Sequence, residues 1–459
     1  MTTAGTTLAS LAGFAVGASP PAAARTTAAT AFLDTIGVTL AGVNEPASRS
    51  VRDVVAVESA GPCVVLGTGL RASATGAALA NGTAAHALDF DDMCFVSLAH
   101  PSAPLVPAAL AAGEVAGASG LAALEAYVVG FEIEARIGGV MNPRHYERGW
   151  HCTSTLGTIG AAAAASRLLG LDADKTGHAL AIAASEASGL KENFGSMVKP
   201  LHAGLAARNG LLAALLAKAG MTASARAIDG PQGFLHAFDG AREDLGGAIA
   251  DLGTRWEILD TGITVKLYPS CAGTHPTIDT ILDLRREHGF AASDIERIDV
   301  DVDSITPTIL IYPHPRSGLE AKFSMPFCAA AAALHGRVGI DTFEEAALAD
   351  PALDALVRRV TMRVDPSFDG RAPALTQSRV RVTLRDGRLL ARDANGARGY
   401  PDRPATVEDL AAKFVACASR ALTQVGAVQA LERLGAFAKA ADISELTKTL
   451  SRAPMSTGG

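Results

Sequence analysis

The chain of 459 residues is short of charge, because only 19% of its residues are Asp, Glu, Lys or Arg, against about a quarter in ordinary globular domains. It also lacks a basic excess, since its net charge is −7 and its pI about 5.9. This composition excludes a broad electrostatic face for nucleic acid or for an anionic membrane. An anionic small molecule would have to be bound by a few local Lys or Arg side chains.

Paired cysteines and long apolar runs are also missing. The six cysteines are scattered singly, with no CxxC motif, which predicts a reducing compartment and no structural zinc. No apolar run is long enough to span a bilayer. The N-terminal segment LASLAGFAVGASPPAAA lacks the basic start of a signal peptide, because the first basic residue is Arg25. We expect a cytoplasmic protein with no membrane partner.

Helical periodicity dominates the first half of the chain, from Leu8 to about Leu259. Ala- and Leu-rich runs carry apolar residues at three- and four-residue spacing and are broken by Gly, Pro and Asp. This pattern predicts an all-helical domain. Its low charge would suit either a large monomeric core or a surface buried between subunits, and we expect an oligomer. Helices are predicted over residues 107–116, 121–136, 155–169, 174–188 and 203–218.

The sequence pattern changes after Thr274, where charged and apolar residues begin to alternate as in strands. Asp386-Gly387, between two alternating runs, predicts a hairpin, and Thr406 with Asp409 predicts a new helix start. The expected fold is therefore mainly α with a second, smaller α+β domain at 266–402, inserted into a large all-helical domain made of 1–265 and 403–459. Strands are predicted near 295–302, 358–365 and 378–393, and helices at 276–288, 323–335 and 342–358.

Ionisable residues concentrate in one interval between Ala-rich runs, HALDFDDMCFVSLAHPSAP at 86–104. Neighbouring carboxylates such as Asp89 raise each other's pKa and can serve as acid or base, although Asp also favours turns and helix ends. His100 precedes a proline, so an extended backbone should present its imidazole from a loop that opens a helix. This interval is the first candidate for chemistry.

Two further clusters lie later in the helical half. In GWHCTSTLGT, His151 stands just before Thr153, Ser154 and Thr155, any of which could cap the next helix and leave its positive end for an anion. A nucleophilic Cys152 is disfavoured, because no orienting acid accompanies it. In MVKPLHAGLAARNG, Lys199 sits in an apolar passage, where a lysine either reaches solvent or meets an anion.

A fourth cluster, VKLYPSCAGTHP, lies where the helical sequence pattern gives way to the mixed pattern, at the boundary between the two predicted domains. Clefts between domains are common ligand sites. The candidates here are Lys266, Tyr268, Cys271 and His275, which we assign to substrate binding. Each of these residue types, taken alone, is also common as a hydrogen-bonded structural group.

Taken together, these clusters resemble the MmgE/PrpD family, which includes 2-methylcitrate dehydratase, cis-aconitate decarboxylase and iminodisuccinate epimerase. The resemblance spans nearly the whole chain, and its segments occur in the family's order. It implies a helical domain assembled from both chain ends, an inserted α+β domain, a homodimer, and an active site between the domains with no metal and no organic cofactor. The matching segments are FLDTIGVTLAG, NGTAAHALDFDD, HPSAPLVPAAL, GWHCTSTLGT, KPLHAGLAARNG, GPQGF, KLYPSCAGTHP and EAKFSMPF.

The resemblance also implies site residues at Asp89, His100, His151, Lys199 and Lys266. The two lysines would clamp carboxylates of a small anionic polycarboxylate and stabilise an enolate-like intermediate. The two histidines would move protons, and Asp89 would orient or charge-balance one of them. We expect His86, Asp91 and Asp92 to have structural roles.

Two positions depart from the decarboxylase pattern, which has Thr in place of Met93 and His in place of Cys271, and the loop before His100 is one residue longer. These departures disfavour cis-aconitate decarboxylation. The leading expectation is a cofactor-independent, dehydratase-like lyase that transfers a proton beside a carboxylate. The alternative is an epimerase of an imino- or aminodicarboxylate. A decarboxylase, or an inactive binding protein of the same fold, is expected less.

Overall fold

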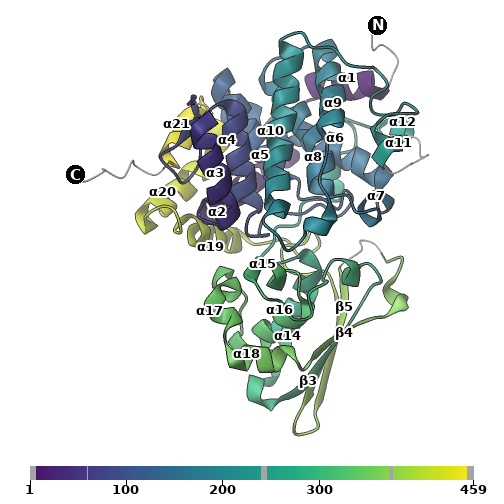
Figure 1. Cartoon of the computed structure of the whole chain (residues 1–459), viewed down its shortest axis with the longest axis vertical. Helices are drawn as coiled ribbons and strands as arrows, with labels where there is room; N and C mark the ends of the chain where they lie inside the picture. The colour runs from purple at the N-terminus through teal and green to yellow at the C-terminus, as the bar shows by residue number, and fades with distance from the viewer. Residues whose placement is uncertain (1–6, 59, 239–244, 372–375, 452–459) are drawn as a thin grey trace.

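The computed structural model describes residues 7–58, 60–238, 245–371 and 376–451. Figure 1 shows a large helical body and, beside it, a smaller part that contains a four-stranded sheet. The expected fold class, mainly α with a second α+β part, is confirmed. The first helices are α1 (Thr7–Gly17), α2 (Ala22–Gly42), α3 (Pro46–Glu58), α4 (Ala74–His86), α5 (Ser102–Ala116), α6 (Gly120–Met141), α7 (Arg144–Glu147), α8 (Cys152–Leu168), α9 (Ala173–Glu186) and α10 (Val198–Lys218).

The predicted helices of the first half are all present, although most begin a few residues earlier than expected. Helix α10 packs against α4, α8 and α9, and α8 packs against α5 and α6. These helices are rich in alanine, whose small side chain allows close approach. Three short helices follow them: α11 (Phe234–Phe238), α12 (Leu245–Ala248) and α13 (Glu257–Asp260).

Two glycines bring α4 and α10 into backbone contact. A Cβ on Gly82 would lie 2.9 Å from the Cα of Gly204, so no larger residue fits at this crossing. The contact brings the C-terminal end of α4, at His86, beside the N-terminal end of α10, at Lys199. The position of the candidate site therefore depends on this packing.

The smaller part has a mixed sheet of order β4-β3-β5-β6. Strand β3 (Ile295–Val302) pairs in parallel with β4 (Val360–Val364) and antiparallel with β5 (Gln377–Leu384), which forms the predicted hairpin with β6 (Leu389–Asn395). Alternate residues of β5 are buried. Helices α14 (His275–His288), α16 (Met325–His335) and α18 (Pro351–Val357) lie together on one side of the sheet (Figure 1).

Three expectations about local structure are wrong. The helix predicted at 342–358 is two short helices, α17 (Glu345–Leu348) and α18, because the side chain of Asp350 caps Ala352 N at 2.8 Å and Pro351 starts a new helix. The helical half also contains two short paired strands, β1 (Cys63–Val64) and β2 (Arg71–Ala72). Finally, α8 begins at Cys152 with His151 as its N-cap, so residues 153–155 lie inside the helix and do not cap it.

The C-terminal helices return to the helical body: α19 (Val407–Ala418), α20 (Gln424–Gly435) and α21 (Ile443–Thr449). The predicted start of α19 is confirmed, since Thr406 and Asp409 form a capping box. Phe414 and Phe437 share a buried core with Phe32 of α2. The boundaries placed at 265/266 and 402/403 stay a prediction. Among the described residues, no single helix is long and apolar enough to cross a membrane, and α2 and α3 meet that test only as a pair bent by 87°.

Candidate active site

Three helix N-termini of the helical body each carry one of the predicted site residues. His100 lies two residues before α5, His151 is the N-cap of α8, and Lys199 is the second residue of α10. The N-terminal end of a helix carries a partial positive charge and suits an anion. A fourth predicted residue, Asp89, follows the C-terminal end of α4 and has a left-handed backbone with φ of 51°.

Asp89 is the centre of a buried ion-pair cluster. Its Oδ1 accepts a 2.6 Å hydrogen bond from Lys199 Nζ, and its Oδ2 lies 3.2 Å from Lys266 Nζ. Lys266 also donates to the backbone oxygen of Asp89 at 3.1 Å. Burial would raise the pKa of Asp89, but the two ammonium groups together hold it well below its usual range. Asp89 is therefore a carboxylate.

His86, Asp91 and His100 form a second, adjoining cluster. Asp91 Oδ2 lies 2.7 Å from His86 Nδ1 and 3.2 Å from His100 Nδ1. On its other side, His100 Nε2 lies 3.8 Å from Asp89 Oδ1. Burial lowers the pKa of His86 to about 3 and also lowers the pKa of His100, so both imidazoles are neutral at neutral pH.

His151 lies within an aromatic group beside these clusters. Its ring stacks on His86 with centroids 5.5 Å apart and meets the Phe194 ring edge to face at 4.9 Å. Its Nδ1 lies 3.0 Å from Nδ1 of His202, so one of these two nitrogens carries the shared proton. Burial, and then the charge of Lys199, lower the pKa of His151 well below the ordinary value.

The clusters enclose a small cavity of about 20 Å³ between the helical body and the smaller part. This volume holds about one water molecule. Polar groups form one side of the lining, while the rest is apolar or aromatic. The lining residues are Asp89, Met93, Leu98, His100, Tyr146, His151, Phe194, Lys199, Cys271, Ala272, Ile309 and Phe323.

The chain matches known proteins along most of its length. The model of the MmgE/PrpD N-terminal domain matches residues 7–244, and that of the MmgE/PrpD C-terminal domain matches 268–434. The chain belongs to the MmgE/PrpD family. The resemblance seen in the sequence motifs is therefore confirmed.

Relatives within the MmgE/PrpD family include a "Cis-aconitate decarboxylase-like protein oryM" of Aspergillus oryzae, which is 30% identical over 92% of this chain and 91% of that protein. The cis-aconitate decarboxylase of Homo sapiens is 31% identical over 77% and 74%, and that of Aspergillus terreus is 29% identical over 78% and 77%. These relatives support an enzyme of the lyase type.

Both positions that depart from the family's decarboxylase pattern, Met93 and Cys271, line the cavity. Burial raises the pKa of the Cys271 thiol, so it is a neutral group. The two departures expected from the sequence resemblance therefore lie in the wall of the cavity, where this chain has a thioether and a thiol.

Three of the predicted site residues do not line the cavity. Tyr268 points to Asp279, to which it donates a short hydrogen bond, and its hydroxyl accepts from Arg398 at 2.8 Å. His275 Nε2 lies 3.1 Å from the backbone oxygen of Ser270, and both residues are fully buried. Lys266 is fully buried and reaches the site through Asp89. Both side chains contact other residues of the smaller part and neither lines the cavity, so the assignment of Tyr268 and His275 to substrate binding stays a prediction.

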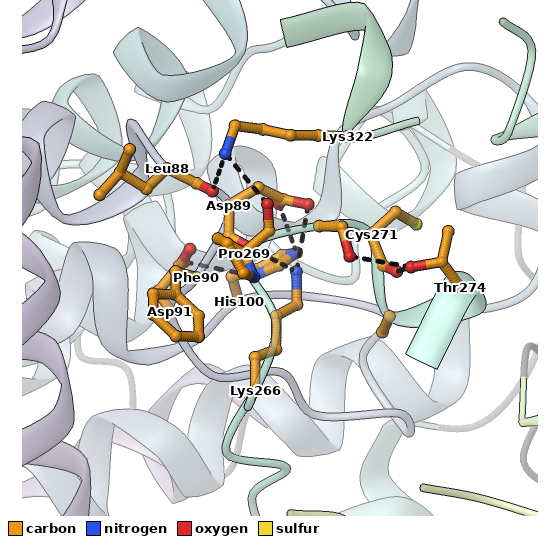
Figure 2. A network of polar contacts seen from close by, with 12 residues as sticks. Leu88, Asp89, Phe90, Asp91, His100, Lys266, Pro269, Cys271, Thr274 and Lys322 are labelled. Atoms are coloured by element: carbon orange, nitrogen blue, oxygen red, sulfur yellow. Dashed lines mark hydrogen bonds and ion pairs between the residues drawn. The ribbon is translucent and has the colours of Figure 1, made fainter. Parts of the chain in front are cut away.

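Sequence reasoning missed Lys322, which precedes Phe323 in the smaller part. Figure 2 shows its ammonium directed at the carbonyl oxygens of Leu88 and Pro269, to which it donates at 2.8 and 3.0 Å. Burial lowers the pKa of Lys322 to about 8. The family segment EAKFSMPF contained this residue, but nothing in its spacing pointed to Leu88.

His86 and Asp91 were also set aside as structural, yet both contact site residues. Together with Asp89 and His100 they offer four donor atoms within 4.8 Å of one another. A divalent cation would compete there with Lys199 and Lys266, whose ammonium groups already contact Asp89, and like charges repel strongly at such distances. The donor set therefore fits ammonium groups and protons better than a metal ion. Independence from metals and cofactors stays a prediction.

Proposed function

We propose that this chain is a lyase that removes a proton from the carbon beside a carboxylate of a small polycarboxylate, in a dehydratase-like elimination. The observation that supports it best is the place of His100 in the cavity wall, with Nε2 3.8 Å from the carboxylate of Asp89. Burial lowers the pKa of His100, which favours its neutral form. A neutral imidazole is the base form of histidine. The first step would therefore be proton abstraction.

Lys199 provides the contact for the substrate's carboxylate. An ammonium has three N–H groups, and Lys199 uses two of them, toward Asp89 and toward His86 Nε2 at 2.9 Å. Among its contacts with described residues, the third N–H is left for a ligand in the cavity that Lys199 lines. Lys266 does not line the cavity but contacts Asp89, and its positive charge favours an anionic intermediate. The N-termini of α5, α8 and α10 add to the same field.

The elimination balances as follows. His100 takes the proton, the electrons of the C–H bond form the new C=C bond, and the adjacent hydroxyl leaves as water with the proton that the His100 imidazolium gives back. His100 is then neutral again, and the third N–H of Lys199 stays with the substrate's carboxylate. The enolate-like charge would be stabilised by donors that are in place before the reaction.

Two other reactions have a specific observation in their favour. The names of the relatives favour decarboxylation, although Met93 and Cys271 depart from that pattern. Two neutral histidines in one cavity, His100 and His151, favour epimerisation, in which one takes the proton and the other returns it on the opposite face. A homodimer in the cytoplasm remains our expectation for the assembly.

The experiment is proton NMR of a panel of small hydroxylated and unsaturated di- and tricarboxylates and of imino- and aminodicarboxylates, each incubated with the protein in D2O. A new alkene signal with loss of the hydroxyl-bearing carbon's proton supports elimination. Release of CO2 identifies a decarboxylase, and deuterium in a stereoinverted product with the same skeleton identifies an epimerase; either result replaces the proposed reaction. No turnover of any compound contradicts the proposal.

A further inference from the structure

Asp91 is a buried carboxylate, and one of its oxygens lies close to the ring nitrogens of two histidines. Its Oδ2 lies 2.7 Å from His86 Nδ1 and 3.2 Å from His100 Nδ1. The two rings meet edge to face, with centroids 4.7 Å apart. Because the carboxylate only accepts hydrogen bonds, the proton between Asp91 and His86 is the one on His86 Nδ1. His100 Nδ1 lies within ion-pair distance of the same oxygen but has no hydrogen-bond partner among the described residues, so Asp91 is the acceptor within its reach.

Lys199 determines which nitrogen of His86 carries the proton. Its ammonium has no acceptor, so His86 Nε2, at 2.9 Å from Nζ, must accept the hydrogen bond. The proton of His86 is therefore on Nδ1, facing Asp91. A positive charge on His86 would also meet Lys199, so His86 stays neutral and leaves the charge of Asp91 uncompensated.

We propose that His86 and Asp91 are positioning residues that place the proton of His100 on Nδ1 and so leave the lone pair on Nε2. The claim deepens the proposed function, because it rests on His100 as the base. The Asp91 carboxylate favours this tautomer and stabilises the imidazolium that forms when Nε2 takes a proton, as a carboxylate behind a histidine base does in hydrolases. His86 keeps that carboxylate available for His100.

The charges that act on His100 come from several elements of the site. Burial lowers its pKa most, Asp91 raises it, and the two lysines lower it. Removing the Asp91 charge should therefore lower the pKa of His100 further and weaken it as a base. The titratable groups that face His100 are His86, Asp89, Asp91, His151, Lys199 and Lys266.

The direct test is nitrogen NMR of the wild-type protein labelled with ¹⁵N-histidine. The variants His86→Gln and His100→Gln assign the two rings. Between about pH 6 and about pH 8, the usual range of histidine titration, we expect both rings to be neutral with the proton on Nδ1. A proton on Nε2 of His100, or a charged His86, would overturn the proposal.

Kinetics of Asp91→Asn and of the matched control Asp92→Asn give the second test. Burial raises the pKa of Asp92 to about 8, so this neighbour is protonated at neutral pH and Asn is a close substitute. Asp91→Asn should lower kcat by about 10²-fold or more with little change in KM, and should move the acidic limb of the pH profile to lower pH. Asp92→Asn should leave both near the wild-type values. An unchanged kcat and pH profile in Asp91→Asn would overturn the proposal.

The two tests separate this claim from the proposed function. If no polycarboxylate is turned over, the function fails, and the tautomer of His100 still decides the positioning claim. If turnover occurs while His100 carries its proton on Nε2, the positioning claim alone fails. The measurement on the wild-type protein also decides the claim if Asp91→Asn does not fold.

Discussion

Lys322 donates a 2.8 Å hydrogen bond to the carbonyl oxygen of Leu88, the residue before Asp89. This bond ties the smaller part of the molecule to the loop that carries the site's central carboxylate. The cavity that Asp89 lines has a volume of about 20 Å³, which is room for about one water molecule. Lys322 is therefore a contact between the two parts of the molecule next to the loop of the site.

The variant Lys322→Met tests this tie. It leaves the buried carbonyl oxygens of Leu88 and Pro269 without their donor, which should lower the free energy of unfolding by about 1–3 kcal/mol. Denaturant unfolding measures the effect. The control is Lys175→Met on the exposed surface of α9, which should change stability by less than about 0.5 kcal/mol. Equal stabilities of the two variants would show that the tie contributes nothing.

Asp92 predicts a pH dependence of stability. Its pKa in the folded protein is raised from 3.8 to about 8 by burial, so between these values the native state keeps a proton that the unfolded chain releases. Stability from this group is therefore full at low pH and is lost as the pH rises through that window. Asp92→Asn should remove the loss, so the variant should gain stability over wild type from about pH 5 to about pH 8, by up to a few kcal/mol. A constant difference across this range would contradict the assignment.

Because α4 and α10 cross in backbone contact, adding a single methyl group at the crossing should lower both stability and activity. A Cβ on Gly204 would overlap Thr83 Oγ1 and the backbone oxygen of Leu79, so Gly204→Ala should cost about 1–3 kcal/mol of stability and should lower activity by moving Lys199 away from His86. In Gly13→Ala of α1 the Cβ meets nothing within 4 Å, and this control should gain about 0.5–1 kcal/mol. Gly204→Ala as stable and as active as wild type would contradict this view of the crossing.

Removing a buried lysine beside Asp89 should lower activity, whereas removing a lysine from the surface should not. Lys266→Met removes a buried charge that contacts both a carboxylate oxygen and the backbone oxygen of Asp89, and kcat/KM for the confirmed substrate should fall by about 10²-fold or more. Steady-state kinetics measure it. Lys439→Met, at an exposed position, is the control and should retain activity. A Lys266→Met enzyme with wild-type kinetics would remove this lysine from the site.

Local patterns in the sequence predicted the helices and the sheet well, because helical spacing, strand alternation and the Asp386-Gly387 turn act over a few residues. They failed where one residue outweighed a long pattern. Pro351 divides a helix that its flanking periodicity predicted as continuous. The two-residue strands at Cys63 and Arg71 are too short to give any alternation.

The site was predictable only in part. Motifs identified Asp89, His100, His151 and Lys199, which do line the cavity. The role of Asp91 was missed, because nothing in the run DFDD distinguishes a carboxylate that faces His100 from one that caps α5, as Asp92 does at Ser102. Lys322 contacts Leu88 across 234 positions of sequence, and such a contact exists only after the two parts have packed together.

The measurement that tests the central claim most directly is deuterium transfer to or from the substrate carbon in D2O, followed by proton NMR for wild type, His100→Gln and the exposed control His335→Gln. If His100 is the base, His100→Gln should exchange at least about 10²-fold more slowly than wild type while unfolding at a similar temperature, and His335→Gln should match wild type. A folded His100→Gln that exchanges within about twofold of wild type, where loss of a general base costs far more, would contradict the account.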